Sequence, residues 1–150
     1  MNEGAPDILL VEDSPTTAEL FAIALKFNKS NATIQVVRDG EAALDLLLGD
    51  APPPGSGLTP LPRLLVLDVH MPRLNGFQVL ERLRADERTR LLPAVMYSGS
   101  DLDSDKHEAL RRGANGFVRK PVGFKEACEV IAQLERDWLT SDAASQSPSP

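Results

Sequence analysis

Short apolar runs alternate with longer amphipathic segments along this chain. The runs are rich in Leu, Val and Ile, which is typical of parallel strands buried on both faces. They predict strands near residues 7–11, 33–37, 64–68, 93–98 and 115–118. Apolar positions recur at helical spacing between them, near residues 15–28, 40–49, 75–86, 102–113 and 122–139. Strict alternation of strand and helix predicts right-handed crossovers, and therefore a doubly wound α/β fold with one five-stranded parallel sheet and five helices.

Residues at the helix ends support these boundaries. Ser14 is a favourable N-cap, and Pro15 suits the first helical position because its backbone is already helix-like. Asn75 can cap the helix near 75–86. The last helix carries an apolar stripe that predicts a face turned to the core, formed by Ala127, Ile131, Leu134 and Trp138. Trp138 lies near the helix end, so contact with a partner is an alternative for this residue.

Two segments depart from the pattern. Residues 50–62 carry five prolines and two glycines. This composition predicts a surface loop inserted between the second helix and the third strand, and a spacer is favoured over a ligand for a proline-recognition domain. Residues 140–150 are rich in Ser, Ala and Pro and are expected to form a disordered tail. One domain is therefore expected over residues 1–139.

Composition narrows the function. The chain has 150 residues, 42% of them hydrophobic and 25% charged, which suits a globular domain with a sizeable core. Its net charge of −6 argues against a nucleic-acid-binding surface. The single cysteine, Cys128, excludes an internal disulfide and is expected to be a small buried apolar residue. No membrane span and no secretory leader are expected, so we expect a cytoplasmic location and no membrane partner.

Reactive residues stand where the predicted strands end. Glu12 and Asp13 follow the first strand, Asp68 ends the third, Ser98 ends the fourth and Lys120 lies just beyond the fifth. The carboxyl ends of parallel strands meet at one edge of a sheet, where open α/β folds bind their ligands. We therefore expect these side chains to form one site.

The chemistry of this set suits phosphoryl transfer. The carboxylate of Asp68 can attack phosphorus to give an acyl phosphate. Asp13 and Asp68 can ligate Mg²⁺ directly and Glu12 can act through water, because this cation prefers oxygen ligands. The backbone carbonyl of His70 could complete the protein ligands. Clustered carboxylates also repel one another, so Lys120 would also hold the metal-free site together.

Three further residues would contact the transferred group. The hydroxyl of Ser98 can donate a hydrogen bond to one phosphoryl oxygen, and the compact ammonium of Lys120 can contact another. Gly99 leaves room beside Ser98, where a bulkier residue would block the phosphoryl group. Each residue alone would be unremarkable, and the combination at one edge makes the prediction specific.

These residues resemble a known family, the receiver domain of bacterial two-component response regulators. The resemblance covers about residues 6–139. The acidic pair after the first strand lies at residues 11–13, and the phosphoacceptor motif with its Met-Pro and Asn-Gly elements lies at residues 67–76. The hydroxyl element lies at residues 97–99 and the fifth-strand motif at residues 113–121. The interval from Asp13 to Asp68 is longer than usual in the family, and the proline-rich segment accounts for the excess.

The resemblance implies a fold and a mechanism. The strand order would be 2-1-3-4-5. Asp68 would accept phosphate from a histidine kinase, with Mg²⁺ or Mn²⁺ bound at the acidic residues. The Lys120–Pro121 peptide would be a candidate for the cis form, since X-Pro bonds have only a small trans preference. Phosphate would draw in Ser98, and the ring of Phe117 would turn inward behind it. An ordinary core position is the other interpretation of Phe117.

The same resemblance implies a responding surface and a class of partner. The switch would alter the surface formed by the helix near 102–113, the strand near 115–118 and the helix near 122–139, and this surface would form a homodimer. Residues 83–93 and 135–139 resemble the stand-alone regulators that pair with phytochrome-type histidine kinases. The chain departs from that group at His70 and at residues 98–100. The resemblance implies that the positions of His70 and Ser100 flank the water that attacks the phosphoryl group.

Three other functions are compatible with parts of the pattern. An interaction module of the same fold would work without phosphorylation, although every reactive residue is present. A metal-dependent phosphatase similar to the haloacid dehalogenases would use Asp68 as nucleophile, but it would carry a second Asp at the position of His70. A flavin carrier would need stacking aromatics and a phosphate-binding loop, whereas these strand ends are acidic. The leading prediction is a phosphoacceptor that is not an enzyme beyond its own phosphorylation and dephosphorylation.

Overall fold

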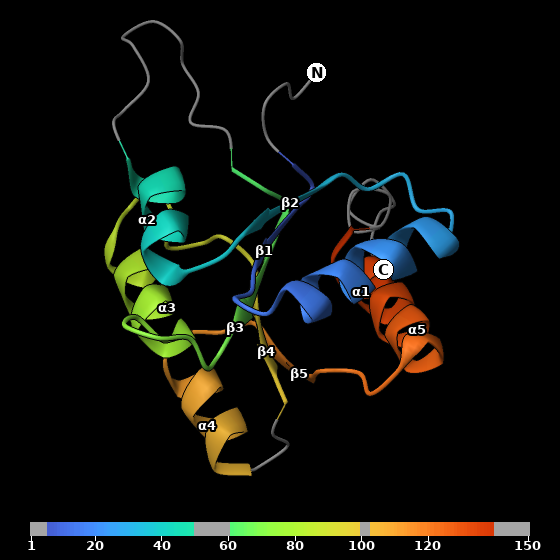
Figure 1. Ribbon diagram of the computed structural model, residues 1–150. Helices are drawn as coiled ribbons and strands as arrows, with labels where there is room; N and C mark the ends of the chain where they lie inside the picture. Colours follow the sequence, from blue (N-terminus) through green and yellow to red (C-terminus); the bar gives the residue numbers. More distant parts are fainter. Residues whose placement is uncertain (1–5, 50–60, 100–102, 140–150) are drawn as a thin grey trace, which may run out of the picture.

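A five-stranded parallel sheet forms the centre of the molecule (Figure 1). The computed structural model describes residues 6–49, 61–99 and 103–139. The strands lie in the order β2-β1-β3-β4-β5, as the resemblance implied. Their bounds are β1 Ile8–Val11, β2 Ile34–Val37, β3 Leu64–Asp68, β4 Ala94–Ser98 and β5 Gly116–Arg119. The doubly wound α/β prediction is confirmed.

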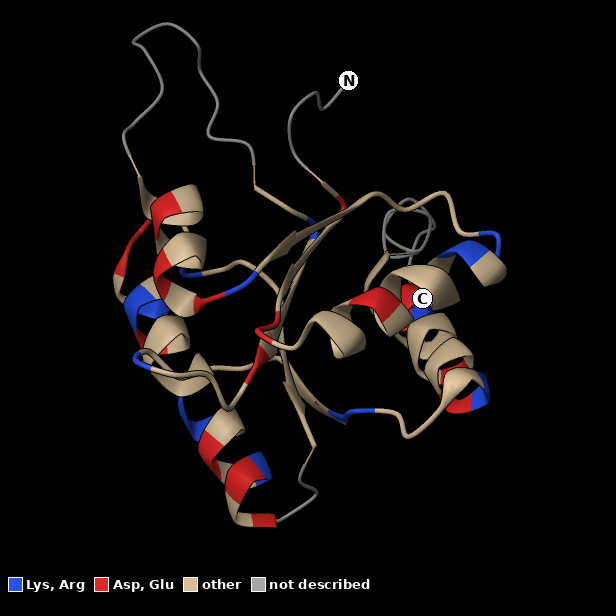
Figure 2. Cartoon of the chain, in the orientation of Figure 1, with Lys and Arg blue, Asp and Glu red and all other residues tan. Residues whose placement is uncertain are grey.

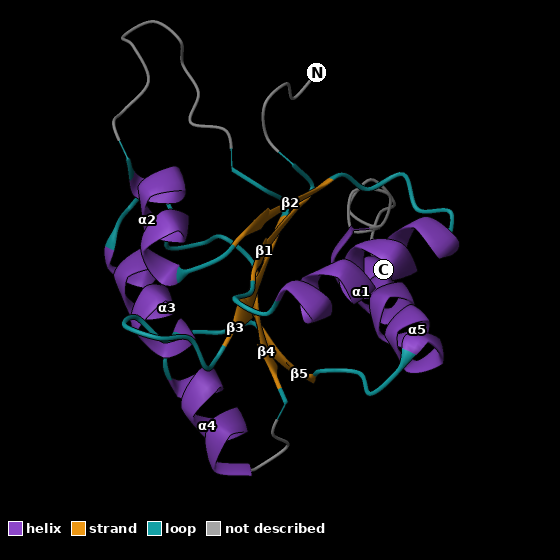
Figure 3. Ribbon diagram, viewed as in Figure 1, coloured by secondary structure: helices purple, strands orange, loops and turns teal. Residues whose placement is uncertain are grey.

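Helices cover both faces of the sheet. α1 and α5 lie side by side on one face, and α2, α3 and α4 lie on the other (Figure 3). Their bounds are α1 Pro15–Phe27, α2 Gly40–Leu48, α3 Gly76–Ala85, α4 Asp103–Arg111 and α5 Phe124–Leu134. The last helix was expected to run to residue 139, but its final turn, Glu135–Leu139, is π-helical. In this turn Trp138 packs close to Gly116 of β5, with a ring carbon 3.7 Å from where a Cβ would lie.

The core has two layers, one on each side of the sheet. The three central strands are buried along their whole length, which explains their continuous apolar sequence. One layer joins the sheet to α2 and α3, and the other joins it to α1 and α5. Cys128 packs against the second layer but is only half-buried, so the burial expected for it is met in part. No helix in the described residues is long and apolar enough to cross a membrane.

The predicted helix caps are formed. The side chain of Ser14 accepts a hydrogen bond from the backbone of Thr17, and Pro15 opens α1. Asn75 caps α3 in a reciprocal capping box with Gln78. Directly after this cap, a Cβ on Gly76 would lie 2.2 Å from the carbonyl oxygen of Asp68, so α3 begins too close to β3 for any larger residue. The cap and the glycine together place the start of α3 against the carboxyl end of β3.

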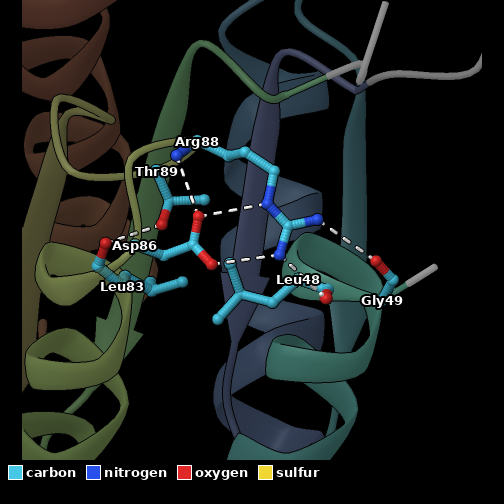
Figure 4. Close-up of polar contacts among 6 residues, drawn as sticks. All are labelled: Leu48, Gly49, Leu83, Asp86, Arg88 and Thr89. Carbon is cyan, nitrogen blue, oxygen red and sulfur yellow. Dashed lines mark hydrogen bonds and ion pairs between the residues drawn. The ribbon is translucent and has the colours of Figure 1, made fainter. Parts of the chain in front are cut away.

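The turn between α3 and β4 is tied to the end of α2 (Figure 4). The guanidinium of Arg88 donates to the carbonyls of Leu48 and Gly49, at 3.2 and 3.3 Å, and also pairs with Asp86. These carbonyls close α2, where a positive charge is favourable. The buried hydroxyl of Thr89 donates to the carbonyl of Leu83 at 2.6 Å. These contacts account for Asp86, Arg88 and Thr89 of the 83–93 motif as parts of a turn.

Some expectations fall outside the described residues or are corrected. Residues 50–60 of the proline-rich segment and residues 140–150 lie outside the described part of the chain. The Lys120–Pro121 peptide is trans, so the cis candidate at Pro121 is wrong. Trans is the ordinary form, favoured for X-Pro by about 0.5–1 kcal/mol. The backbone before it is already fixed, because Lys120 donates its amide hydrogen to the carbonyl of Ser98 at 2.7 Å.

Candidate functional site

The reactive residues meet at the carboxyl edge of the sheet. Glu12 follows β1, Asp68 ends β3 and Ser98 ends β4, while Lys120 follows β5. The strand registers pair Val11 with Leu67, Leu67 with Met96 and Ser98 with Arg119. These pairings hold the carboxyl ends of the strands at one level. Acidic residues at the ends of β1 and β3 appear red near the middle of the molecule in Figure 2. These residues therefore lie together at one edge of the sheet, as predicted.

An ammonium group joins the two buried carboxylates. Glu12 is 0% exposed and Asp68 is 1% exposed. The Nζ atom of Lys120 lies 2.9 Å from Oε1 of Glu12 and 3.1 Å from Oδ1 of Asp68. It also donates to Oε2 of Glu12 at 3.1 Å. Burying two like charges is costly without a counter-ion, and Lys120 supplies one. The expectation that a cation stabilises the metal-free site is met by this geometry.

Backbone donors also point at the carboxylates. The amide of Ser14 donates to Oε2 of Glu12 at 3.2 Å. The amide of His70 donates to Oδ1 of Asp68, also at 3.2 Å. Each donor lies two residues after its acceptor, in the loop that follows the strand. The local chain therefore fixes the orientation of each carboxylate before any ligand binds.

The donor set of this edge suits a hard divalent cation. Glu12, Asp13 and Asp68 each offer a carboxylate oxygen, and the three oxygens lie within 4.8 Å of one another. Among the described residues, Oε1 of Glu12 is the one buried side-chain oxygen or nitrogen that receives no hydrogen bond. The Nζ atom of Lys120 lies 2.9 Å from this oxygen. A buried carboxylate oxygen of this kind, with two further carboxylates near it, fits Mg²⁺ or Mn²⁺.

Burial and neighbouring charges shift the pKa of Asp68, the candidate phosphoacceptor. Desolvation is the largest cause that raises the pKa of Asp68, to about 7, and the neighbouring charge of Glu12 adds to it. The ammonium of Lys120 opposes this rise. The pKa of Lys120 is itself raised, because stabilisation of the charged form by Glu12 and Asp68 outweighs the desolvation of the ammonium. A cation bound among the carboxylates would favour the ionised form of Asp68, the form that the sequence analysis expects to act as nucleophile.

The residues expected to contact or sense the phosphoryl group lie on the adjacent strands. Ser98 is fully buried and lies one residue beyond the β4 position that pairs with Asp68. Gly99 is exposed, and a Cβ there would find no atom within 4 Å, so the space beside Ser98 is open. Phe117 is half-buried on β5 and packs against the layer that includes α3. The structure thus places Phe117 on the same side of the sheet as α4.

His70 extends from the site toward α4. Its side chain is 68% exposed, with Nε2 4.0 Å from Oδ2 of Asp105 in the first turn of α4. The imidazole does not join the carboxylate cluster among the described residues. Ligation of a metal by the backbone carbonyl of His70 stays a prediction.

Sequence reasoning missed one aromatic residue of the site. Tyr97 is 1% exposed, and its ring centroid lies 5.9 Å from Nζ of Lys120. Burial, followed by the charges of Glu12 and Asp68, raises the pKa of its hydroxyl above the ordinary value. The signal was available, since Tyr97 directly precedes Ser98, but a strand residue within an apolar run is indistinguishable from an ordinary core residue in sequence.

Comparison with known protein families identifies the family to which the chain belongs. The sequence pattern of the response regulator receiver domain matches residues 8–132. The chain belongs to this family. Receiver domains bind a divalent metal at an acidic pocket and are phosphorylated by histidine kinases, and the cluster of Glu12, Asp13 and Asp68 fits the pocket. The resemblance to the receiver domain and the strand order 2-1-3-4-5 that it implied are confirmed.

A curated relative supports the assignment along most of its length. The probable methanogenesis regulatory protein FilR2 of Methanothrix harundinacea is 33% identical to this receiver domain over 132 residues, covering 88% of this chain and 83% of the relative. Several other curated relatives are longer regulators, and the chain spans only 46–55% of their length.

The similar solved structures include regulators linked to light. Response regulator RPA3017 in red light signaling of R. palustris is 30% identical, with a TM-score of 0.78, covering 89% of this receiver domain and 94% of that chain. The bacteriophytochrome response regulator RtBRR is 36% identical, with a TM-score of 0.69 and coverages of 87% and 78%. The Mn²⁺-bound form of response regulator Rcp1 is 26% identical, with a TM-score of 0.75 and coverages of 89% and 94%. The narrower resemblance noted in the sequence is therefore matched by these structures.

Proposed function

We propose that this receiver domain is a metal-dependent phosphoacceptor, and that Asp68 takes a phosphoryl group from the phosphohistidine of a histidine kinase. The observation that carries the proposal is the contact of Lys120 with Oδ1 of the buried Asp68, beside two further carboxylates. An interaction module that is never phosphorylated has no need to bury Glu12 and Asp68 together, because their burial is costly.

The transfer exchanges one bond to phosphorus for another. An oxygen of the ionised Asp68 attacks phosphorus, and the bond from phosphorus to the histidine nitrogen breaks with its electron pair returning to the imidazole. Asp68 carries the acyl phosphate that results. The amide of His70, 3.2 Å from Oδ1, orients the carboxylate for this attack.

The divalent cation would be held by Asp13 and Asp68, with Glu12 acting through water and the carbonyl of His70 completing the protein ligands. When bound, it supplies positive charge that neutralises the phosphoryl oxygens and the carboxylates. Lys120 contacts a second phosphoryl oxygen, and the hydroxyl of Ser98 donates to a third. Gly99 leaves open space for the group. We infer no enzymatic activity beyond phosphorylation and dephosphorylation of the domain itself.

Phosphorylation would be transmitted to the surface formed by α4, β5 and α5. Of the described part of α4, only Ala109 is buried, so this helix has little core to hold it in one position. Ser98 would move toward the phosphoryl group, and the half-buried ring of Phe117 would turn into the space behind it. The altered surface would then form a homodimer. A groove of about 260 Å³ on this surface, between β5 and α5, is lined by apolar residues that include Phe117 and Trp138.

Phosphorylation itself is tested by intact mass after incubation with acetyl phosphate and Mg²⁺. The wild type should gain one phosphoryl group, which is lost with a chelator. Asp68→Asn should gain none. Asp45→Asn is the matched control, because it makes the same chemical change at an exposed position of α2 and should not alter the gain. An adduct that persists on the Asp68→Asn protein excludes Asp68 as the acceptor.

We also propose a phytochrome-type histidine kinase as the partner. The support is the similarity to the bacteriophytochrome response regulator RtBRR and to a regulator of red light signaling. The test compares phosphotransfer from a purified autophosphorylated bacteriophytochrome kinase with transfer from an unrelated histidine kinase. Faster transfer from the bacteriophytochrome supports the assignment, and equal or slower transfer contradicts it.

Sedimentation velocity tests the dimer. Beryllium fluoride with Mg²⁺ serves as the phosphoryl mimic, and Trp138→Ser alters the groove between β5 and α5. The mimic should increase the dimer fraction of the wild type and leave Trp138→Ser monomeric. A purely monomeric wild type with the mimic bound contradicts this part of the proposal.

A further inference from the structure

The single tyrosine of the chain, Tyr97, is a core residue whose ring reaches the site. Tyr97 pairs in register with Asp68 on the neighbouring strand. Paired residues of adjacent parallel strands direct their side chains to the same face of the sheet, so the ring and the carboxylate share the face that α1 and α5 cover. The ring is 1% exposed. Its position is therefore set by the sheet and not by a surface loop.

The ring lies close enough to Lys120 to attract its charge. The distance from Nζ to the ring centroid is 5.9 Å, within the range of about 6 Å over which an ammonium and an aromatic ring attract one another. The same ammonium contacts Glu12 and Asp68. Two carboxylates and one aromatic ring therefore surround the charged end of a long, flexible side chain.

The ring itself is held firmly. Phe21 of α1, also 1% exposed, packs edge-to-face against it with a centroid distance of 5.8 Å and an interplanar angle of 80°. The carbonyl of Tyr97 accepts a hydrogen bond from the amide of Val69 at 3.1 Å, directly after the phosphoacceptor candidate. The ring is thus part of a rigid core that reaches the site.

From these contacts we propose that Tyr97 is a positioning residue for phosphoryl transfer, whose ring keeps the ammonium of Lys120 beside Asp68. The inference rests on the proposed function. Lysine has a flexible stem with considerable rotamer entropy, so a single partner restrains it weakly. A divalent cation among the carboxylates would weaken their attraction for Lys120. The attraction of the ring does not depend on the carboxylate charge, so its contribution matters most when the site is loaded.

Three variants separate positioning from packing. Tyr97→Leu removes the ring, and Tyr97→Phe keeps it without the hydroxyl. Ile131→Ala leaves a packing defect at an equally buried position of the same layer, on α5 and outside the Phe21–Tyr97 ring pair. The first readout is the NMR shift of the Lys120 side-chain methylene protons in the metal-free protein, because an aromatic ring displaces the resonances of nearby protons. The second is the initial rate of phosphorylation by acetyl phosphate with Mg²⁺.

The ring displacement of the Lys120 resonances should persist in Tyr97→Phe and Ile131→Ala and disappear in Tyr97→Leu. The phosphorylation rate should fall about 2- to 30-fold in Tyr97→Leu, the range expected for one cation–ring contact, and stay near the wild-type rate in Tyr97→Phe. Unchanged Lys120 resonances in Tyr97→Leu, or an equal rate loss in Ile131→Ala, overturn the inference. A wild type that takes up no phosphoryl group overturns the proposed function and the positioning role with it, whatever the resonances show.

Discussion

The Nζ atom of Lys120 lies 3.1 Å from Oδ1 of Asp68, although 52 residues of chain separate the two positions in the sequence. The pairing allows an acid to be buried at the end of a central strand without a bound ligand. It also makes the stability of the domain depend on charge at this one place.

Removal of the ammonium should destabilise the metal-free domain. In Lys120→Met the buried carboxylates lose their counter-ion, and breaking a buried pair in this way costs about 3 kcal/mol or more. Asp68 can escape part of this cost by taking up a proton, so the loss should be smaller at pH 5 than at pH 7.5. Urea unfolding at the two pH values measures it. Lys106→Met, at an exposed position of α4, is the control, and an equal loss in both variants would contradict the prediction.

The raised pKa of Asp68 predicts a pH dependence of stability. The folded state holds this proton up to about pH 7, whereas the unfolded chain releases it near the ordinary pKa of 3.8. The folded state binds more protons between these values, so the free energy of unfolding should fall as pH rises from about 4 to 7. One proton gives a slope that approaches about 1.4 kcal/mol per pH unit.

Asp68→Asn should remove this contribution. Chemical unfolding of wild type and variant in metal-free buffer, from pH 4 to pH 8, gives two profiles whose difference isolates the residue. The variant should be the more stable protein near pH 8, because it relieves the repulsion with Glu12. Parallel profiles over the whole range would show that the folded state does not retain the Asp68 proton.

Metal binding should depend on Asp13. This residue is one of three whose carboxylate oxygens lie within 4.8 Å of one another, and ligand charge sets the affinity for hard divalent cations. Asp13→Asn should therefore raise the dissociation constant for Mg²⁺ by about tenfold or more. Isothermal titration with Mg²⁺, and with Mn²⁺ as a second probe, measures it. Asp45→Asn makes the same change on the exposed face of α2, and a matching loss there would mean that general charge, and not ligation, is responsible.

The turn after α3 should control the end of α2. Arg88→Ala removes the guanidinium that donates to the carbonyls of Leu48 and Gly49 (Figure 4). Amide hydrogen exchange in the last turn of α2 should become faster, since a helix end without its cap opens more readily. Arg90→Ala, at an exposed position of the same turn, should leave that exchange unchanged. Equal exchange in wild type and Arg88→Ala would show that the cap does not stabilise this helix end.

Most of the fold could be predicted because its signals are local. Each central strand is a continuous apolar run, since both of its faces are covered, and Ser14 and Asn75 announced the helices that they cap. The last turn after Leu134 could not be predicted in this way. Trp138 keeps the helical spacing in sequence, but its packing beside Gly116 accompanies a π-helical turn that spacing does not reveal.

The sequence by itself determined which residues end the strands, and parallel topology then required Glu12, Asp68, Ser98 and Lys120 to share one edge. Only the tertiary structure decided how they interact there. It buried Glu12 completely, set the Lys120 ammonium between two carboxylates, left the peptide before Pro121 trans and brought the ring of Tyr97 to the site. The physical reason is the distance along the sequence over which each interaction acts. The spacing of apolar residues and the capping of helices depend on neighbours along the chain. Burial, pKa and side-chain contacts depend on groups that meet only when distant strands pair.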